Sequence, residues 1–117
     1  MIQYMNNLWA EIDGTTITVG LLEEAVSDIS QIKRIELPED EASVEAHEVC
    51  GELYTDQGPI NLYCPVAGEV REINAAVNDD PSLILEDPQG EAWLFKVEAD
   101  EEVDVDELIQ EIRDLDE

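Results

Sequence analysis

The chain has few basic residues. Its 117 residues include five lysines and arginines against 31 aspartates and glutamates, which gives a formal net charge of −26. A surface of this kind repels phosphate backbones and anionic membrane surfaces, so we exclude nucleic acids and membranes as partners. The acidity suits a basic protein partner or simple solubility, and adaptation to high salt is an alternative explanation of the same composition.

Long apolar runs and the residue groupings of common active sites are also missing. No apolar stretch approaches the roughly 20 residues that cross a bilayer, and no signal-peptide pattern is present, so we expect a cytoplasmic protein. Its two cysteines, Cys50 and Cys64, are then expected to be reduced thiols. Because we find no Ser-His-Asp grouping, phosphate-binding loop or Cys-x-x-Cys knuckle, we predict neither an enzyme nor a metal site.

The apolar fraction of 44% is ordinary and supports one domain over residues 1–117. Thr15–Leu21 alternates in polarity after Asp13-Gly14, a turn signal that predicts a hairpin with the segment before it. Further strands are expected in residues 32–37, 44–54, 59–73 (divided near 65–68) and 93–99. The pattern predicts a mainly β protein, either a small sandwich or a partly closed barrel.

Two segments have the spacing of amphipathic helices. Leu21–Ser30 predicts a short helix of two or three turns, and residues 104–115 predict an acidic C-terminal helix. Asp104 or Asp106 is able to cap the start of the second helix. The stretch between them that contains Asp-Pro and Gln-Gly pairs has turn composition, so Ser82–Leu85 is expected to be at most a brief turn or strand.

Four blocks of sequence follow one another with almost no gaps. They are ITVG at 17–20, IELPE at 35–39, LYCPVAGEVREIN at 62–74 and DDPSLILEDPQGEAWLFKV at 79–97, and the acidic C-terminal segment follows them. In these blocks the chain resembles the H protein family of the glycine cleavage system, a relative of the lipoyl and biotinyl carrier domains. The resemblance implies a lipoyl-domain-like hybrid barrel-sandwich with a short helix in its N-terminal half and a C-terminal helix.

The resemblance also gives a role to the hairpin around residue 57. In the family this hairpin carries a lysine to which lipoate is joined by an amide, and the spacing to the neighbouring blocks aligns that lysine with Gln57. The nitrogen of a carboxamide is not a nucleophile, so no lipoyl amide forms on Gln57. The chain therefore resembles a divergent member that lacks the lipoyl-lysine, and we expect no covalent lipoate.

Two further positions of the family's lipoyl site are neutral in this chain. The family holds its amine-loaded arm with an acid before a tryptophan and an aspartate after the lysine, and these align with Leu8 and Asn61. Loss of the lysine and of both acids indicates that the site no longer performs carrier chemistry. The predicted function is that of a non-catalytic protein-binding or regulatory homologue, with glycine-cleavage or lipoate-metabolism enzymes as candidate partners.

The predicted binding surface is the hairpin tip, formed by Tyr54, Asp56, Gln57 and Gly58. The same residue types also suit a plain solvated turn. A different function would use Cys50 and Cys64, which each lie seven residues from Gln57. If the hairpin closes at that residue, the two thiols face each other as in a small redox carrier, whereas a shift of one residue separates them. The third alternative is a vestigial copy without an activity of its own.

Overall fold

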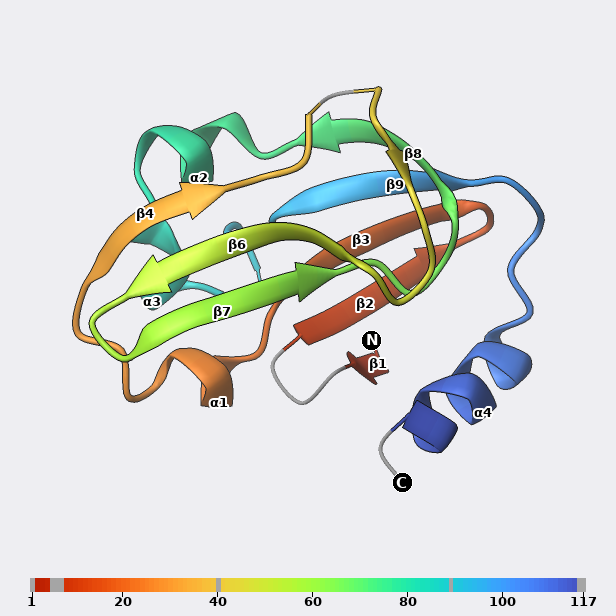
Figure 1. Ribbon diagram of the computed structural model, residues 1–117, viewed down its shortest axis with the longest axis horizontal. Coiled ribbons are helices and arrows are strands. Elements are labelled where there is room, and N and C mark those ends of the chain that lie inside the picture. The colour runs from red at the N-terminus through yellow and green to blue at the C-terminus, as the bar shows by residue number, and fades with distance from the viewer. Residues whose placement is uncertain (1, 5–7, 40, 89, 116–117) are drawn as a thin grey trace.

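The computed structural model describes residues 2–4, 8–39, 41–88 and 90–115. Within them the strands are β1 (Ile2–Tyr4), β2 (Leu8–Asp13), β3 (Thr16–Leu21), β4 (Ile32–Glu36), β5 (Ser43–Val44), β6 (Val49–Thr55), β7 (Gly58–Tyr63), β8 (Gly68–Ile73) and β9 (Phe95–Ala99). The helices are α1 (Glu23–Val26), α2 (Ala75–Asp79), α3 (Leu83–Glu86) and α4 (Val105–Leu115), and Figure 1 shows their arrangement.

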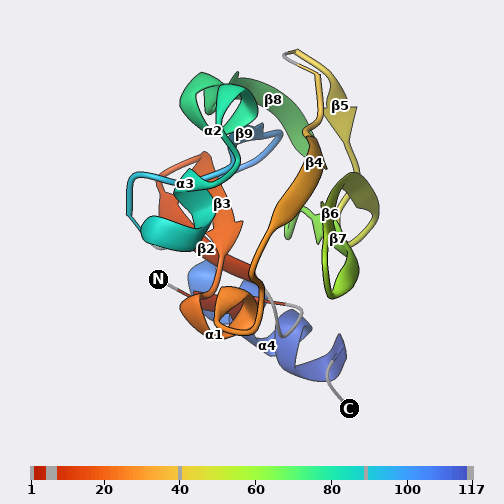
Figure 2. The ribbon, with the colours of Figure 1, turned by 90° about the vertical axis from the view of Figure 1, so that its left-hand side faces the viewer.

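The strands form two antiparallel sheets. One has the strand order β1-β2-β3-β9-β8-β5, and the other consists of β4, β6 and β7 with β6 in the middle. Figure 2 shows β4, β6 and β7 on one side of the molecule, facing the larger sheet. Side chains from both sheets fill the core, among them the fully buried Ile17, Leu53, Leu62 and Phe95. The prediction of a mainly β sandwich is therefore confirmed.

The first predicted hairpin is present. β2 and β3 pair along their whole length, from Leu8 opposite Leu21 to Asp13 opposite Thr16. Ile17 and Val19 alternate into the core, as the period of two requires. In β4 the sequence left the buried face ambiguous, and the structure assigns it to Ile35, with a register shift earlier in the same strand.

The helix predicted over residues 21–30 is much shorter than expected. Leu21 belongs to β3, and Leu22 is extended, with φ −71° and ψ 146°, so α1 has only four residues. The Ser27 hydroxyl donates a hydrogen bond to the carbonyl of Glu24, a local contact that competes with continued helix. The apolar residues of this segment are buried because the chain folds over the core, so their spacing gave a false helical period.

The segment predicted as turns after β8 contains two short helices, α2 and α3, so that prediction is wrong. Asn74 caps α2, because its Oδ1 accepts a hydrogen bond from the Ala76 amide at 3.2 Å. The Asn74 side-chain amide also donates to the carbonyls of Glu91 and Trp93, both at 2.8 Å. The turn-forming residues in this stretch therefore start and end helical turns whose buried side chains complete the core.

The C-terminal helix agrees with its prediction. Asp104 is the capping residue, since its Oδ1 accepts a hydrogen bond from the Glu107 amide at 3.2 Å. Leu108 is buried, whereas Val105 is 42% exposed. In Figure 1, α4 lies at one corner of the molecule, and its Leu108 side chain belongs to the hydrophobic core.

Candidate functional site

β6 and β7 form a tight hairpin whose turn consists of Asp56 and Gln57. Thr55 and Gly58 face each other at the last position of the ladder. The Thr55 hydroxyl accepts a hydrogen bond from the Gln57 amide (3.0 Å) and donates one to the Gly58 carbonyl (2.8 Å). Gly58 has a φ of +107°, which glycine adopts without a steric penalty. The residues of the tip thus define its conformation.

Asp56 ties this tip to the segment that precedes β4. Its Oδ1 accepts hydrogen bonds from the amides of Ser30 and Gln31, both at 3.1 Å, and its own amide donates to the Gln31 carbonyl at 3.1 Å. The hydrogen bond from the Gln31 amide contributes most to holding the pKa of Asp56 below its usual value, and the hydrogen bond from the Ser30 amide lowers the pKa further. The sequence offered no local signal for this contact, because its partners lie 25 and 26 residues away.

The two remaining side chains of the tip are presented to solvent in different ways. Gln57 is exposed at the apex, where its side-chain amide donates to Oδ2 of Asp56 at 3.3 Å. Tyr54 is half-buried in β6, and the guanidinium carbon of Arg34 lies 4.6 Å from the centre of its ring. This stack, which joins β4 to β6, was not anticipated from the sequence.

The two cysteines lie near the other end of the hairpin. The ladder shifts register between Val49 and Gly51, so Cys50 is an extra residue in a bulge, and Cys64 follows the end of β7. The Cys50 thiol donates to the Leu62 carbonyl at 3.4 Å, and neither cysteine is in a disulfide.

Both thiols are poor sources of thiolate. Burial, and next the proximity of Cys64, raises the pKa of Cys50 to about 12. Burial raises the pKa of Cys64 to about 11. Because the thiolate is the reactive form, both side chains are weak nucleophiles near neutral pH.

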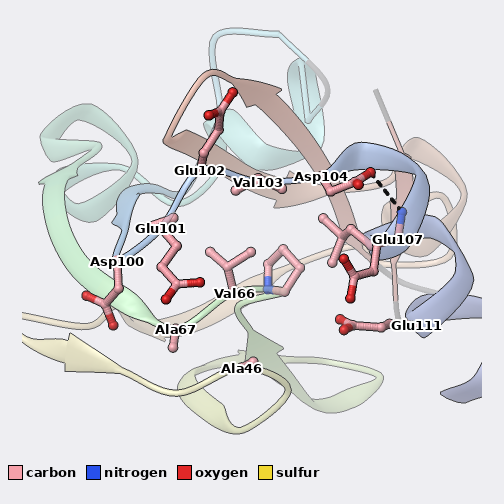
Figure 3. Close-up of a pocket in the computed structure, with 13 residues that line it drawn as sticks. Ala46, Val66, Ala67, Asp100, Glu101, Glu102, Val103, Asp104, Glu107 and Glu111 are labelled. Carbon is pink, nitrogen blue, oxygen red and sulfur yellow. Dashed lines mark hydrogen bonds between the residues drawn. The ribbon is translucent and has the colours of Figure 1, made fainter.

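A groove of about 430 Å³ lies between α4 and the loop that follows β7. Pro65 and Val66 form part of its lining, and Figure 3 shows acidic side chains surrounding Val66. The acidic residues are Asp100, Glu101, Glu102, Asp104, Glu107 and Glu111. The Nε2 of His47 lies 3.7 Å from Oε2 of Glu111, one of these acidic residues. Among the described residues, no group of three or more His, Cys, Asp or Glu side chains is arranged to hold a metal ion.

Comparison with known proteins relates this hairpin sandwich to one family. The family model described as "Glycine cleavage H-protein" matches residues 2–115. The chain belongs to the glycine cleavage H-protein family. Over 94 residues it is 44% identical to the glycine cleavage system H protein of Thermobifida fusca, covering 80% of this chain and 75% of the relative. The H protein of Rubrobacter xylanophilus is 39% identical over 97 residues, which cover 83% and 77% of the two chains.

A solved structure supports the same assignment. The crystal structure of a glycine cleavage system H protein from Mycobacterium marinum superposes with a TM-score of 0.75 at 29% identity, covering 92% of this chain and 91% of that one. The resemblance inferred from the sequence blocks and the fold that it implied are both confirmed. Within the described residues, no helix is long and apolar enough to cross a membrane.

The positions that align with the acids of the H-protein site differ in their surroundings. Leu8 lies in β2 with no exposed surface and belongs to the hydrophobic core. Asn61 is exposed in β7 of the other sheet, opposite Glu52. A buried leucine and a neutral carboxamide offer no charge to a cationic group, so neither position supplies the counter-ion that the resemblance assigns to the family.

Proposed function

We propose that this member of the H-protein family works without covalent lipoate, as a non-catalytic protein-binding or regulatory homologue. The observation that carries the proposal is Gln57, which occupies the exposed apex of an intact β6–β7 hairpin. The spacing of the family's sequence blocks aligns Gln57 with the attachment lysine, and a carboxamide is not a nucleophile and cannot form the lipoyl amide. The hairpin would therefore contact a partner through its own side chains and not through an attached cofactor.

Neither lysine of the chain substitutes for the missing attachment site. Lys33 lies within β4 and not at a turn. Lys96 lies within β9, where its ammonium group is 3.9 Å from Oε1 of Glu72 and 4.8 Å from the centre of the Trp93 ring. An enzyme that attaches lipoate at the end of a hairpin would find no lysine presented in that way.

The partners that fit this proposal are enzymes of glycine cleavage or lipoate metabolism, reached in the cytoplasm. A protein that keeps the fold of the carrier but has no arm would occupy a docking site without passing on a reactive group. The thiol redox carrier is less well supported, because burial keeps both cysteines protonated near neutral pH. No particular contact favours a vestigial copy.

Intact mass tests the proposal directly. The protein is expressed in a host with active lipoate attachment and lipoate in the medium, together with the variant Gln57→Lys and a known lipoylated H protein as the positive control. We expect the wild type to have the mass of the bare chain. A lipoyl-sized increase on any wild-type residue would overturn the proposal.

The variant shows how much of the recognition surface survives. Lipoylation of Gln57→Lys would mean that residue 57 alone blocks modification and that the lipoate-attaching enzyme still recognises the rest of the hairpin. An unmodified variant would mean that the neighbours Tyr54 and Asp56 also prevent recognition. Circular dichroism of both proteins establishes that they are folded, which is expected because Gln57 is exposed.

A further inference from the structure

The three-stranded sheet presents an ordered outer face beside the hairpin tip. Its register places Arg34 opposite Tyr54 and Tyr54 opposite Pro59, so these three side chains form a first row across the strands. In the same way Glu36, Glu52 and Asn61 form a second row. We call these six residues the outer face.

The opposite side of the same strands belongs to the core. Ile35, Leu53 and Leu62 are buried, and they alternate with the residues of the outer face as the pleat requires. In both ribbon views no helix covers the outer side of β4, β6 and β7 (Figures 1 and 2). Within the part of the chain that the structure describes, the outer face therefore remains open.

Contacts between its own side chains hold this face in shape. Arg34 pairs with Glu36 at 2.7 Å and stacks on the ring of Tyr54. Interaction with the Glu52 carboxylate raises the pKa of the Tyr54 phenol above its ordinary value. Since these side chains are already ordered, less rotamer entropy is lost when a partner binds to them.

The face differs in character from the rest of the protein. The chain has a net charge of −26, whereas the six residues of the face include one basic and two acidic side chains, and its Pro59 and Asn61 lie in a stretch from 57 to 68 without a charged residue. Tyrosine and arginine are enriched at protein interfaces, and the first row contains both beside a proline. The second row adds two carboxylates, of which Arg34 pairs with only the one on Glu36. The face thus combines an aromatic row with a row of net negative charge.

We propose that the outer face is the surface on which this protein docks a cationic partner segment, one that carries an aromatic or proline side chain next to lysine or arginine. The apolar side chain would pack on Tyr54 and Pro59, and the cation would lie over Glu52 and Glu36. This inference rests on the proposed protein-binding function and identifies its contact surface and the chemistry of its partner.

The net charge of the chain favours a basic partner over a second copy of the chain as the occupant of the outer face. Two copies would bring −26 against −26, and this long-range repulsion opposes self-association. A basic partner is attracted by the same field, which speeds the encounter, while the two rows provide the close contacts. The cationic segment is therefore the occupant to which the electrostatics point.

The test is an amide NMR titration of the whole chain at an ionic strength of about 0.1 M, where charges more than about 10 Å apart are largely screened. The probe is a capped hexapeptide of alternating lysine and tryptophan. Two capped hexapeptides serve as controls: lysine alternating with serine tests charge alone, and glutamate alternating with tryptophan tests aromatic contact alone. We expect saturable shifts centred on Arg34, Glu52, Tyr54 and Asn61 with the first peptide, and weaker or no shifts with the others.

Variants separate the outer face from the general acidity of the protein. Tyr54→Ala should weaken binding of the lysine-tryptophan peptide by about fivefold, whereas Tyr54→Phe keeps the ring and should stay within about twofold. Glu52→Gln should weaken it by about twofold. The matched control is Glu69→Gln, an exposed charge of the other sheet, which should leave the affinity unchanged. The dispersion of the amide spectrum establishes that each variant is folded.

Five results would overturn the inference: no binding of the lysine-tryptophan peptide, equal binding of the lysine-serine peptide, an equal effect of Glu69→Gln, shifts centred on the acidic groove of α4, or concentration-dependent dimerisation through the outer face. The titration does not depend on lipoylation. A wild type that carries lipoate would overturn the proposed function, but binding of the peptide to the outer face would still stand. An unmodified wild type that does not bind the peptide would overturn this inference and leave the proposed function intact.

Discussion

At the scale of single residues, the hairpin turn divides two tasks between neighbours. Gln57 determines what chemistry the apex offers, because its exposed carboxamide nitrogen is not a nucleophile. Asp56 determines how the apex is held, because its carboxylate binds the amides of Ser30 and Gln31. Gln57 therefore offers no nucleophile at the apex, and Asp56 holds the apex in a fixed position.

The role of Asp56 predicts a stability that depends on pH. Its hydrogen bonds lower its pKa in the folded protein below the reference value of 3.8. For a carboxyl group with a lowered pKa, the stabilisation is complete above the unfolded pKa and is lost as the pH falls through the folded value. Asp56→Asn keeps an oxygen acceptor but cannot ionise. We expect it to be less stable than the wild type at pH 7, with the difference closing below about pH 3.8.

Urea unfolding at a series of pH values measures this difference. Asp28→Asn removes a charge from another exposed position and serves as the control, for which we expect a smaller effect at pH 7. A gap between Asp56→Asn and the wild type that persists unchanged at pH 2.5 would show that the charge of Asp56 does not contribute. Asp56→Ala, which loses the acceptor as well, should be the least stable variant at pH 7.

At the scale of secondary structure, the accuracy of the sequence predictions depends on how local the determinants are. The β2–β3 hairpin and α4 were predicted correctly, since turn residues, alternation and a capping aspartate act over a few positions. The helix expected over residues 21–30 failed because strand pairing keeps Leu21 extended. The two helices after β8 were missed because the Asp-Pro and Gln-Gly pairs were read as turns, and the cap by Asn74 was not recognised.

The same distinction applies to the candidate site. The position of Gln57 followed from spacing between sequence blocks, and the structure places it at the turn of the β6–β7 hairpin. The tether of Asp56 and the stack of Arg34 on Tyr54 join residues at least 20 positions apart, so no local pattern reveals them. The bulge at Cys50 likewise results from the pairing of β6 with β7.

The cap of α4 provides a test at this scale. Asp104→Ala removes the acceptor for the Glu107 amide and should destabilise the helix by about 1 kcal/mol. Because α4 lies at a corner of the fold, we expect the effect in local opening: its amide hydrogens should exchange about fivefold faster while those of β3 and β9 do not change. Asp106→Ala is the matched control, with a loss of a few tenths of a kcal/mol. Equal effects of the two variants would contradict the assignment of the cap.

At the scale of the whole molecule, repulsion among acidic side chains opposes the stability that the packed core provides. Thirty-one acidic residues surround a core that is closed by two sheets, and only five basic residues offset them. Self-repulsion of this size destabilises the compact state and at the same time keeps copies apart in solution. Two residues of the outer face, Pro59 and Asn61, belong to the stretch from Gln57 to Gly68, which contains no charged residue.

Because the acidic side chains repel one another, we expect added salt to stabilise the protein. At 1 M NaCl the Debye length falls to about 3 Å, from about 10 Å at 0.1 M, so repulsion among the acidic side chains is screened. Each 1 kcal/mol gained should raise the Tm of a domain of this size by about 3–6 °C. The exposed Arg34–Glu36 pair weakens under the same conditions, but such pairs contribute at most about 1 kcal/mol. Screening of the repulsion among the many acidic side chains therefore outweighs the loss of this ion pair, and the Tm should rise with salt.

Thermal unfolding followed by circular dichroism, at NaCl concentrations from 0.05 to 1 M, measures the effect. Potassium acetate and sodium chloride should give similar gains, because screening depends on ionic strength, whereas sucrose at matched osmolality controls for preferential exclusion. A variant with Glu101 and Glu102 both changed to glutamine, two exposed acids of the groove beside α4, should start from a higher Tm and gain less from salt. A Tm that falls or stays constant with salt would show that local ion pairs, and not the repulsion among the acidic residues, control the stability of this protein.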